Sequence, residues 1–174
     1  MERIAVFGFT LSLMLVWPGQ ANFAEPPPSK NKPDPAESAR NLVTQFMKAM
    51  QLRNLDDIMT MVDVPWCHDM KTTIYDRKEL ELDFHRLLEK HRNRPTMQYD
   101  VRPAYAYADV REKLPDQERK DIDKVIRPTD YIVLVYVKTP APAAQTEQEI
   151  VVFFVRHRNN EFTVVGLKNR NNER

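Results

Sequence analysis

The stretch YIVLVYV at residues 131–137, together with IVVFFV at residues 150–155, decides the fold of this chain. β-branched and aromatic residues dominate both stretches, and each has the length of a single β-strand. Neighbouring side chains of a strand point to opposite faces, so strands as apolar as these bury both faces. We expect helices to cover one face of the sheet. A second copy of the chain, or a strong curl of the sheet, must cover the other.

Two more strands are predicted beside this pair. Asn159-Asn160 joins the second stretch to residues 162–167 and favours a tight hairpin, because Asn tolerates a left-handed backbone. Upstream, apolar residues recur at alternate positions, which predicts a strand with Tyr99, Tyr105 and Tyr107 on one face. Pro103 lacks the N–H of a sheet ladder, so this strand lies at an edge or contains a bulge.

Helices are predicted before the strands. Asp34-Pro35-Ala36-Glu37 combines an N-cap residue with a first-turn proline and an acidic third position. It begins a helix that runs to about Leu52, with apolar residues recurring at helical spacing. Asn54 can cap a second, shorter helix over residues 55–61.

The segments that follow are less regular. A proline and several polar residues favour a loop over residues 63–69, and a short strand follows at residues 72–75. Asp76 then caps a third helix that ends near Arg92. Residues 112–126 are highly charged and predict a helical excursion between two strands.

The first residues have the layout of a secretory signal peptide. Arg3 gives a basic start, residues 4–17 are apolar, and small residues follow at Gly19 and Ala21. The apolar run is shorter than the ~20 residues that a membrane-spanning helix needs. We therefore predict that residues 1–21 are a signal peptide and that the mature protein is extracytoplasmic, either periplasmic or secreted. An uncleaved N-terminal anchor is the alternative.

A tether and a single domain are expected after the signal peptide. Residues 22–34 are rich in proline and predict an extended linker. Residues 35–168 form one domain, which suits a chain of 174 residues, and residues 169–174 form a disordered tail. Cys67 is the single cysteine, so it cannot form an intrachain disulfide. Burial as a small apolar residue is its simplest role; pairing between chains and a reactive thiol are the alternatives.

Composition excludes several classes of protein. Lys and Arg together number 26 and Asp and Glu number 25, which leaves a net charge of +1. This balance gives no positive surface for nucleic acid, and none for a membrane once the signal peptide is removed. The chain has three glycines, and they do not cluster as a phosphate-binding loop requires. P-loop and dinucleotide-fingerprint enzymes are therefore excluded, and no cofactor is predicted.

The order of these elements resembles the nuclear transport factor two-like superfamily, also called SnoaL-like or cystatin-like α+β. The likeness is carried by residues 39–57, by Val64-Pro65 leading to residues 72–75, and by the strands between residues 130 and 167. In that fold a curved antiparallel sheet wraps around the N-terminal helices and leaves a cone-like pocket. The resemblance implies a homodimer through the sheet face. It also implies functions that range from isomerases and dehydratases to binding and scaffolding, among which the fold does not choose.

The densest group of chemistry-bearing side chains lies at residues 63–69. A carboxylate near a histidine suits general acid–base chemistry, so Asp63 and His68 are candidate catalytic residues. The alternative is that this segment is a surface connection and that Trp66 packs as a lid over the core. A metal site is not predicted, because Cys67, His68 and Asp69 are adjacent and their side chains point to opposite sides of an extended segment.

The tyrosines have two interpretations. With Trp66, the side chains of Tyr99, Tyr105 and Tyr107 can line a pocket for a small apolar ligand. They can equally pack in the core or in a subunit interface. In isomerase-like relatives an Asp base faces a Tyr donor, so the resemblance implies that one of the three plays that part opposite Asp63.

These observations predict an exported domain without catalytic activity that binds a small ligand or another protein and is a homodimer. The alternative is a small lyase or isomerase with Asp63 or His68 as the general base and a pocket tyrosine as the donor.

Overall fold

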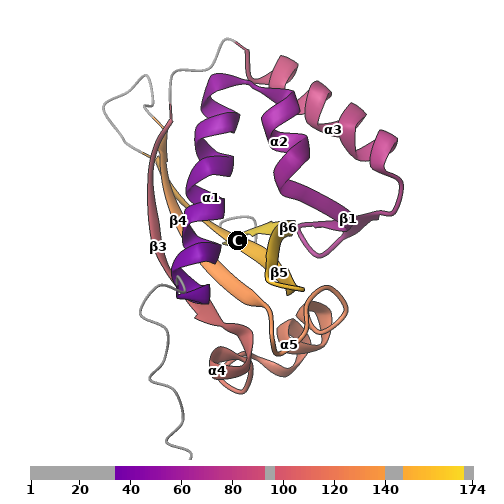
Figure 1. The fold of residues 1–174 in the computed structure, drawn as a ribbon. Coiled ribbons are helices and arrows are strands. Elements are labelled where there is room, and N and C mark those ends of the chain that lie inside the picture. The colour runs from indigo at the N-terminus through magenta and orange to yellow at the C-terminus, as the bar shows by residue number, and fades with distance from the viewer. Residues whose placement is uncertain (1–33, 93–96, 140–146, 171–174) are drawn as a thin grey trace, which may run out of the picture. The chain divides into compact units, whose positions relative to one another are not determined.

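The computed structural model describes residues 34–92, 97–139 and 147–170 and has an α+β architecture (Figure 1). The predicted signal peptide, nearly all of the linker and the last four residues lie outside the described residues. The elements in chain order are α1 (Pro35–Leu52), α2 (Leu55–Met61), β1 (Val62–His68), β2 (Thr72–Ile74), α3 (Arg77–Lys90), β3 (Gln98–Ala106), α4 (Tyr107–Arg111), α5 (Asp116–Ile122), β4 (Tyr131–Thr139), β5 (Glu147–Arg158) and β6 (Glu161–Asn169).

The strands form a single curved sheet in the order β2-β1-β6-β5-β4-β3. Neighbouring strands are antiparallel, except that β1 and β6 run parallel. α1 packs against β3, β4 and β6, and α3 packs against α2 and β1. The α+β fold class, with a curved sheet around N-terminal helices, is therefore the one that the sequence predicts. No helix among the described residues has a stretch long and apolar enough to span a membrane.

The helix starts depend on the side chains that the sequence singles out. The Asp34 carboxylate accepts a hydrogen bond from the Ala36 N–H at 3.0 Å, and the Asn54 side chain accepts one from the Asp57 N–H at 3.2 Å. Asp76 accepts from two N–H groups of the first turn of α3, at 2.8 and 3.0 Å. Each carboxylate or amide thus satisfies donors that a helix N-terminus leaves without partners.

The β5–β6 hairpin also forms as predicted. Asn159 and Asn160 both have positive φ, 52° and 64°, which is the backbone of the tight turns that match the twist of a hairpin.

Residues 63–69 are not the predicted loop. Val62–His68 forms β1, in which Trp66 is 2% exposed and Cys67 is 3% exposed. The pairing of β1 with β6 shifts register between Val62 and Cys67, and Pro65 lies within that shift, where no ladder N–H is needed. Two partner strands therefore make this segment a strand: β2, which follows it directly, and β6, about a hundred residues away in the sequence.

The tyrosines do not share one face, and this prediction is wrong. β3 is an edge strand whose pairing with β4 shifts register between Val101 and Ala104, at Pro103. Tyr99, before the shift, packs with the core under α1, whereas Tyr105, after it, faces the opposite side of the sheet. Tyr107 has left the strand and is the first residue of α4. The bulge predicted from Pro103 is therefore what separates them.

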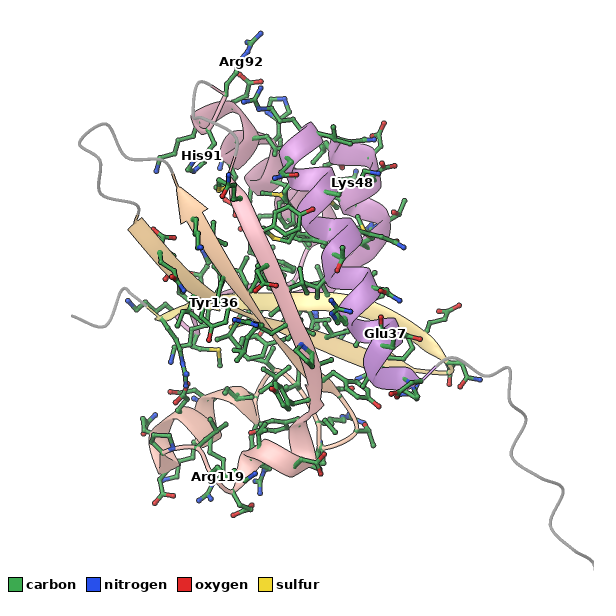
Figure 2. The ribbon with its side chains drawn as sticks, turned by 90° about the vertical axis from the view of Figure 1, so that its left-hand side faces the viewer. Glu37, Lys48, His91, Arg92, Arg119 and Tyr136 are labelled. Atoms are coloured by element: carbon green, nitrogen blue, oxygen red, sulfur yellow. The ribbon has the colours of Figure 1, made fainter. Side chains whose placement is uncertain are left out.

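A second apolar core covers the outer face of the sheet, away from α1. Tyr107, Ile122 and Ile126 pack there against Ile132 and Phe154. Figure 2, which views the sheet from its β3 edge, shows α1 on one side and the segment of α4 and α5 on the other. The chain thus covers much of this face by itself. The apolar pattern of β4 and β5 does not require a second copy over that part.

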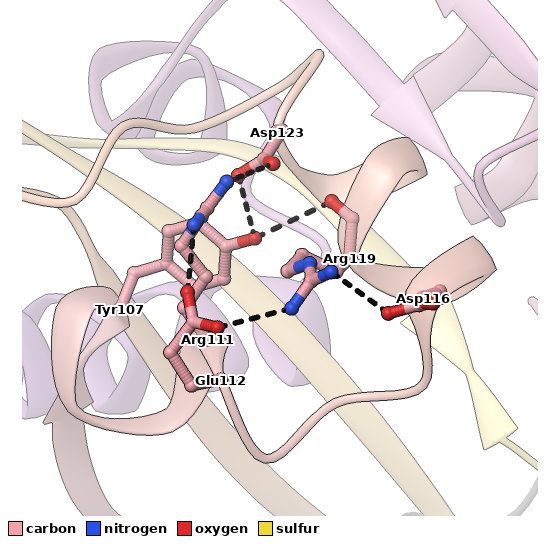
Figure 3. Close-up of polar contacts among 6 residues, drawn as sticks. All are labelled: Tyr107, Arg111, Glu112, Asp116, Arg119 and Asp123. Atoms are coloured by element: carbon pink, nitrogen blue, oxygen red, sulfur yellow. Dashed lines mark hydrogen bonds and ion pairs between the residues drawn. The ribbon is translucent and has the colours of Figure 1, made fainter.

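A network of charges holds α4 and α5 together (Figure 3). Arg111 donates to both carboxylate oxygens of Asp123, at 2.8 and 2.6 Å, and the Tyr107 hydroxyl donates to the same carboxylate at 2.9 Å. Arg119 pairs with Glu112 and with Asp116, at 3.1 and 2.7 Å. The charged residues of the segment 112–126 therefore pair with one another on its outer side. The apolar residues of the same segment pack against the sheet.

Candidate ligand-binding pocket

A cavity of about 460 Å³ lies between α1, α3 and the concave face of the sheet, and we call it the helix–sheet pocket. Its lining is mainly apolar, with charged and polar residues among the apolar ones. The lining residues are Phe46, Met47, Met50, Trp66, His68, Asp69, Asp83, Phe84, Arg86, Leu87, Lys90, Met97, Val137, Glu149, Val151, Phe153, Leu167 and Asn169.

Four aromatic rings contact one another in the wall of this pocket. Phe46 lies 6.5 Å from Trp66, 6.1 Å from Phe84 and 5.5 Å from Phe153, measured between ring centroids. Trp66 and Phe84 meet edge to face at 5.1 Å. Rings from α1, β1, α3 and β5 thus stabilise one another, and they give the pocket a fixed apolar wall.

The pairing of β1 with β6 places a polar group in the pocket. His68 lies opposite Leu167, and the Asp69 N–H donates to the Leu167 carbonyl at 2.8 Å. The Asp69 carboxylate accepts from the Asn169 N–H at 2.7 Å and lies 3.8 Å from His68 Nε2. These bonds fix the Asp69 side chain beside the imidazole. A histidine next to a carboxylate can take or give a proton, or can bind a polar group of a ligand.

α3 and β5 add charges of both signs to the lining. Arg86 and Lys90 are one helical turn apart, so both lie on the side of α3 that lines the pocket, as does Asp83. Glu149 accepts a hydrogen bond from the Asn169 side chain at 3.1 Å. Sequence reasoning missed these residues, because a charged position that faces a pocket has the same local pattern as one that faces solvent.

The predicted site residues do not lie in one place. Trp66 and His68 line the helix–sheet pocket. Asp63 lies in a different cavity, where its carboxylate pairs with Arg156 at 3.2 Å. The structure therefore does not bring Asp63 and His68 to one site.

None of the three candidate tyrosines is among the lining residues of the helix–sheet pocket. Tyr99 packs beside the main core, and Tyr105 is 44% exposed on the outer face. Tyr107 is fully buried, and burial together with the hydrogen bond to Asp123 raises its pKa to about 12. The pairing of an Asp base with a Tyr donor, which the resemblance implies, does not form in this pocket.

Cys67 is a buried free cysteine next to this site. Burial raises the pKa of its thiol, and its Sγ lies 3.8 Å from the Met70 sulfur. Both observations describe a protonated, apolar side chain. Among the residues that the structure describes, no three His, Cys, Asp or Glu side chains are grouped so as to hold a metal ion.

Comparison with known proteins identifies the fold. No protein-family model matches the sequence, and no curated protein matches it. Among solved structures, a nuclear transport factor two-like protein of unknown function from Pseudomonas putida KT2440 superposes with a TM-score of 0.52 at 8% identity, covering 77% of this chain and 84% of that one. A domain of unknown function with a cystatin-like fold from Nostoc punctiforme PCC 73102 gives a TM-score of 0.51 at 14% identity, covering 77% and 75%. The chain therefore has the nuclear transport factor two-like, or cystatin-like, α+β fold that the order of its predicted elements resembles.

Proposed function

We propose that this protein is an extracytoplasmic binding domain for a small, mainly apolar molecule that carries a polar end. The observation that supports the proposal is the helix–sheet pocket, a cavity of about 460 Å³ with an aromatic wall and with His68 and Asp69 in its lining. Ligand pockets in proteins typically have volumes of roughly 300–1,000 Å³, apolar walls and a few polar groups that fix the orientation of the ligand.

The placement of the candidate catalytic groups favours binding over catalysis. General acid–base chemistry on one substrate needs the base and the donor within hydrogen-bond reach of the same reacting atoms. Asp63 lies in another cavity, and none of the three tyrosines lines this pocket. Arg86 and Lys90 can instead attract an anionic end of a ligand, while the aromatic wall buries its apolar part.

Native mass spectrometry of the protein recovered from an exporting host, compared with its denatured mass, tests the proposal. We expect excess mass in the native form that is lost on denaturation and that identifies the bound molecule. The denatured mass also tests whether the predicted signal peptide is cleaved after Ala21 or retained as an anchor.

A matched pair of substitutions on α3 ties binding to this pocket. Leu87 lines the pocket, whereas Leu82 on the same helix is 57% exposed. With 1-anilinonaphthalene-8-sulfonate as the probe, we expect saturable dye fluorescence that Leu87→Trp abolishes and Leu82→Trp leaves unchanged. Equal binding by the wild type and Leu87→Trp would show that the ligand does not occupy this cavity.

Catalysis is the second candidate, and the observation that favours it is the His68–Asp69 pair within the pocket. In that case His68 is the general base, and the wild type converts the retained molecule into a species of different mass. His68→Asn should then retain the molecule unchanged. If the wild type and His68→Asn release the same molecule after incubation, the binding function stands and the catalytic one is rejected.

A homodimer is also part of the proposal. The part of the outer face near Tyr136 and Ile150 lies beyond the cluster that packs under α4 and α5, and it is half-buried in the single chain. A second copy that covers this part would complete the burial that the sequence pattern calls for. The native mass decides the point, since a mass of one subunit rules the dimer out.

A further inference from the structure

A second cavity, of about 350 Å³, lies where β1, the end of β5 and the segment after α5 meet. We call it the arginine pocket. It is lined by residues 63–65, residues 123–127, Arg156 and Arg158. It lies outside the helix–sheet pocket and shares no lining residue with it.

Arg156 is the central side chain of this cavity and is nearly buried, with 6% of the residue exposed. Its Nη1 donates to the Asp63 carboxylate at 3.2 Å and to the Val64 carbonyl at 3.3 Å. No hydrogen bond of the described residues uses its Nε or Nη2. In the part of the chain that the structure describes, every fully buried side-chain nitrogen has a partner, so these two nitrogens must keep an accessible surface.

Two further arginines lie beside Arg156. The exposed side chains of Arg127 and Arg158 line the same cavity and form no ion pair with another described residue. Burial lowers the pKa of Arg156, and the charges of Arg158 and Arg127 lower it further. The carboxylates of Asp63 and Asp130 act in the opposite direction and raise the pKa of Arg156. An anion bound in the cavity would likewise favour the charged form of Arg156.

The acidic groups around the cavity are already engaged. Asp63 pairs with Arg156, and Asp123 is held by Arg111 and Tyr107. The buried Asp130 carboxylate accepts hydrogen bonds from the backbone N–H groups of Arg127 and His157, at 2.8 and 2.9 Å. Lys124, the remaining cation of the lining, pairs with Asp121 at 2.7 Å. Among the side chains that line the cavity, Arg127 and Arg158 have no ion pair with a described residue, and both are positive.

We propose that the arginine pocket binds a phosphate group, either free or carried by a small molecule. The Nε and Nη2 of a guanidinium form a planar fork that matches two oxygens of a phosphate. Arg156 presents that fork in a nearly fixed position, because Asp63 and Val64 hold its other nitrogen. Arg127 and Arg158 can then contact the remaining oxygens, and the cavity has room for an organic part as well.

Calorimetric titration of the full chain with inorganic phosphate, and separately with glycerol 3-phosphate, tests the proposal. We expect saturable binding that weakens as chloride is added. Arg158→Gln and Arg127→Gln should each weaken binding by about tenfold or more, as for other charge-assisted hydrogen bonds. Arg102→Gln is the matched control. Arg102 is an exposed arginine that lies over the Tyr136 ring at 4.8 Å, away from this cavity, and its loss should change nothing.

Asp63→Asn separates an anion site from a merely structural ion pair. It removes a negative charge that repels the ligand, while the amide oxygen can still accept from Arg156 Nη1, so phosphate should bind several-fold more tightly. Arg156→Lys keeps the charge but loses the fork, so it should weaken binding.

Tighter binding of glycerol 3-phosphate than of inorganic phosphate assigns the site to a phosphorylated small molecule, and the reverse assigns it to the free ion. Absence of saturable binding by the wild type, or equal affinities for Arg158→Gln and Arg102→Gln, would overturn the proposal. The exposed positions 127 and 158 keep the test valid if Asp63→Asn does not fold.

Discussion

Gly166 lies where β6 approaches β1 more closely than any side chain allows. A Cβ at this position would lie 2.5 Å from the Cys67 carbonyl oxygen and 3.1 Å from the Cys67 backbone nitrogen. The obstacle is backbone rather than a flexible side chain, so it cannot move aside without breaking the parallel pairing of the two strands. The glycine is needed here for space.

Gly166→Ala should therefore destabilise the domain by about 1–3 kcal/mol, the usual cost of adding atoms to a packed interior. The free energy of unfolding from urea titration measures this. Glu161→Ala, an exposed position on the same strand, is the control and should cost little. Because the Cys67 backbone is the obstacle, adding Cys67→Ala should not rescue the variant, and a rescue would show that the side chain was the problem.

Tyr107 makes stability depend on pH in the alkaline range. Its pKa is raised from 10.0 to about 12 by burial and by the hydrogen bond to Asp123. Below pH 10 the phenol is protonated in both the folded and the unfolded chain, so its contribution is complete. Between pH 10 and 12 the unfolded chain loses the proton and the folded chain keeps it, so stability falls as pH rises.

The loss assigned to Tyr107 over this range should be on the order of 1–3 kcal/mol. Tyr107→Phe should lose that pH dependence, while costing about 1 kcal/mol at neutral pH for the missing hydrogen bond. Tyr75→Phe serves as the control, because Tyr75 is 75% exposed. Identical stability curves for the wild type and Tyr107→Phe between pH 10 and 12 would contradict this account.

At the scale of elements, α3 depends on its N-cap residue, Asp76, which directly precedes the helix. Asp76 accepts two N–H hydrogen bonds, and α3 supplies Phe84 and Leu87 to the helix–sheet pocket. Asp76→Ala should destabilise the domain by about 1 kcal/mol, whereas Asp76→Ser, which keeps an oxygen acceptor, should recover most of that loss. Thermal unfolding of the two variants measures the difference. Equal melting temperatures for Ala and Ser at this position would mean that the cap contributes nothing.

The elements that the sequence predicts correctly are those with local signals. Asp34, Asn54 and Asp76 mark helix starts within one turn of chain, and Asn159-Asn160 marks its hairpin in the same way. β1 is harder to predict, because Pro65 argues against a strand and one of the two partners of Cys67 is the distant Gly166, the other being Thr73 in β2. Pro103 predicts a bulge in β3. It does not predict that the bulge turns Tyr99 and Tyr105 to opposite faces, because this depends on how β4 pairs with β3.

The candidate site shows the same division. Trp66 and His68 are candidates by residue type, since aromatic rings and imidazoles are common in binding sites, and both line the pocket. The sequence does not single out Arg86, Lys90 or Glu149, because only the tertiary arrangement distinguishes them from ordinary surface charges. Nearness in sequence predicts that Asp63 and His68 share a site, but β1 places them in different cavities.

The whole molecule has one apolar core on each side of its sheet. Phe153 and Phe154 are neighbours in β5 and lie in opposite cores, with 2% and 0% of each residue exposed. In a single chain, Phe153→Ala and Phe154→Ala should therefore cost similar amounts, about 3–5 kcal/mol each. Urea unfolding at several protein concentrations measures both. A cost for Phe154→Ala that is small at low concentration and grows with concentration would mean that a second copy, rather than α4 and α5, buries that side chain.

The position of β1 beside β6 also determines when this protein can fold. β1 ends at His68, yet the strand that it borders runs from Glu161 to Asn169. A chain emerging from the ribosome can form the β1–β2 hairpin, but it cannot pair β1 with β6 until the residues of β6 have been made. The sheet, and the pocket wall to which Trp66 and Leu167 belong, is therefore completed only after every other described strand has been made.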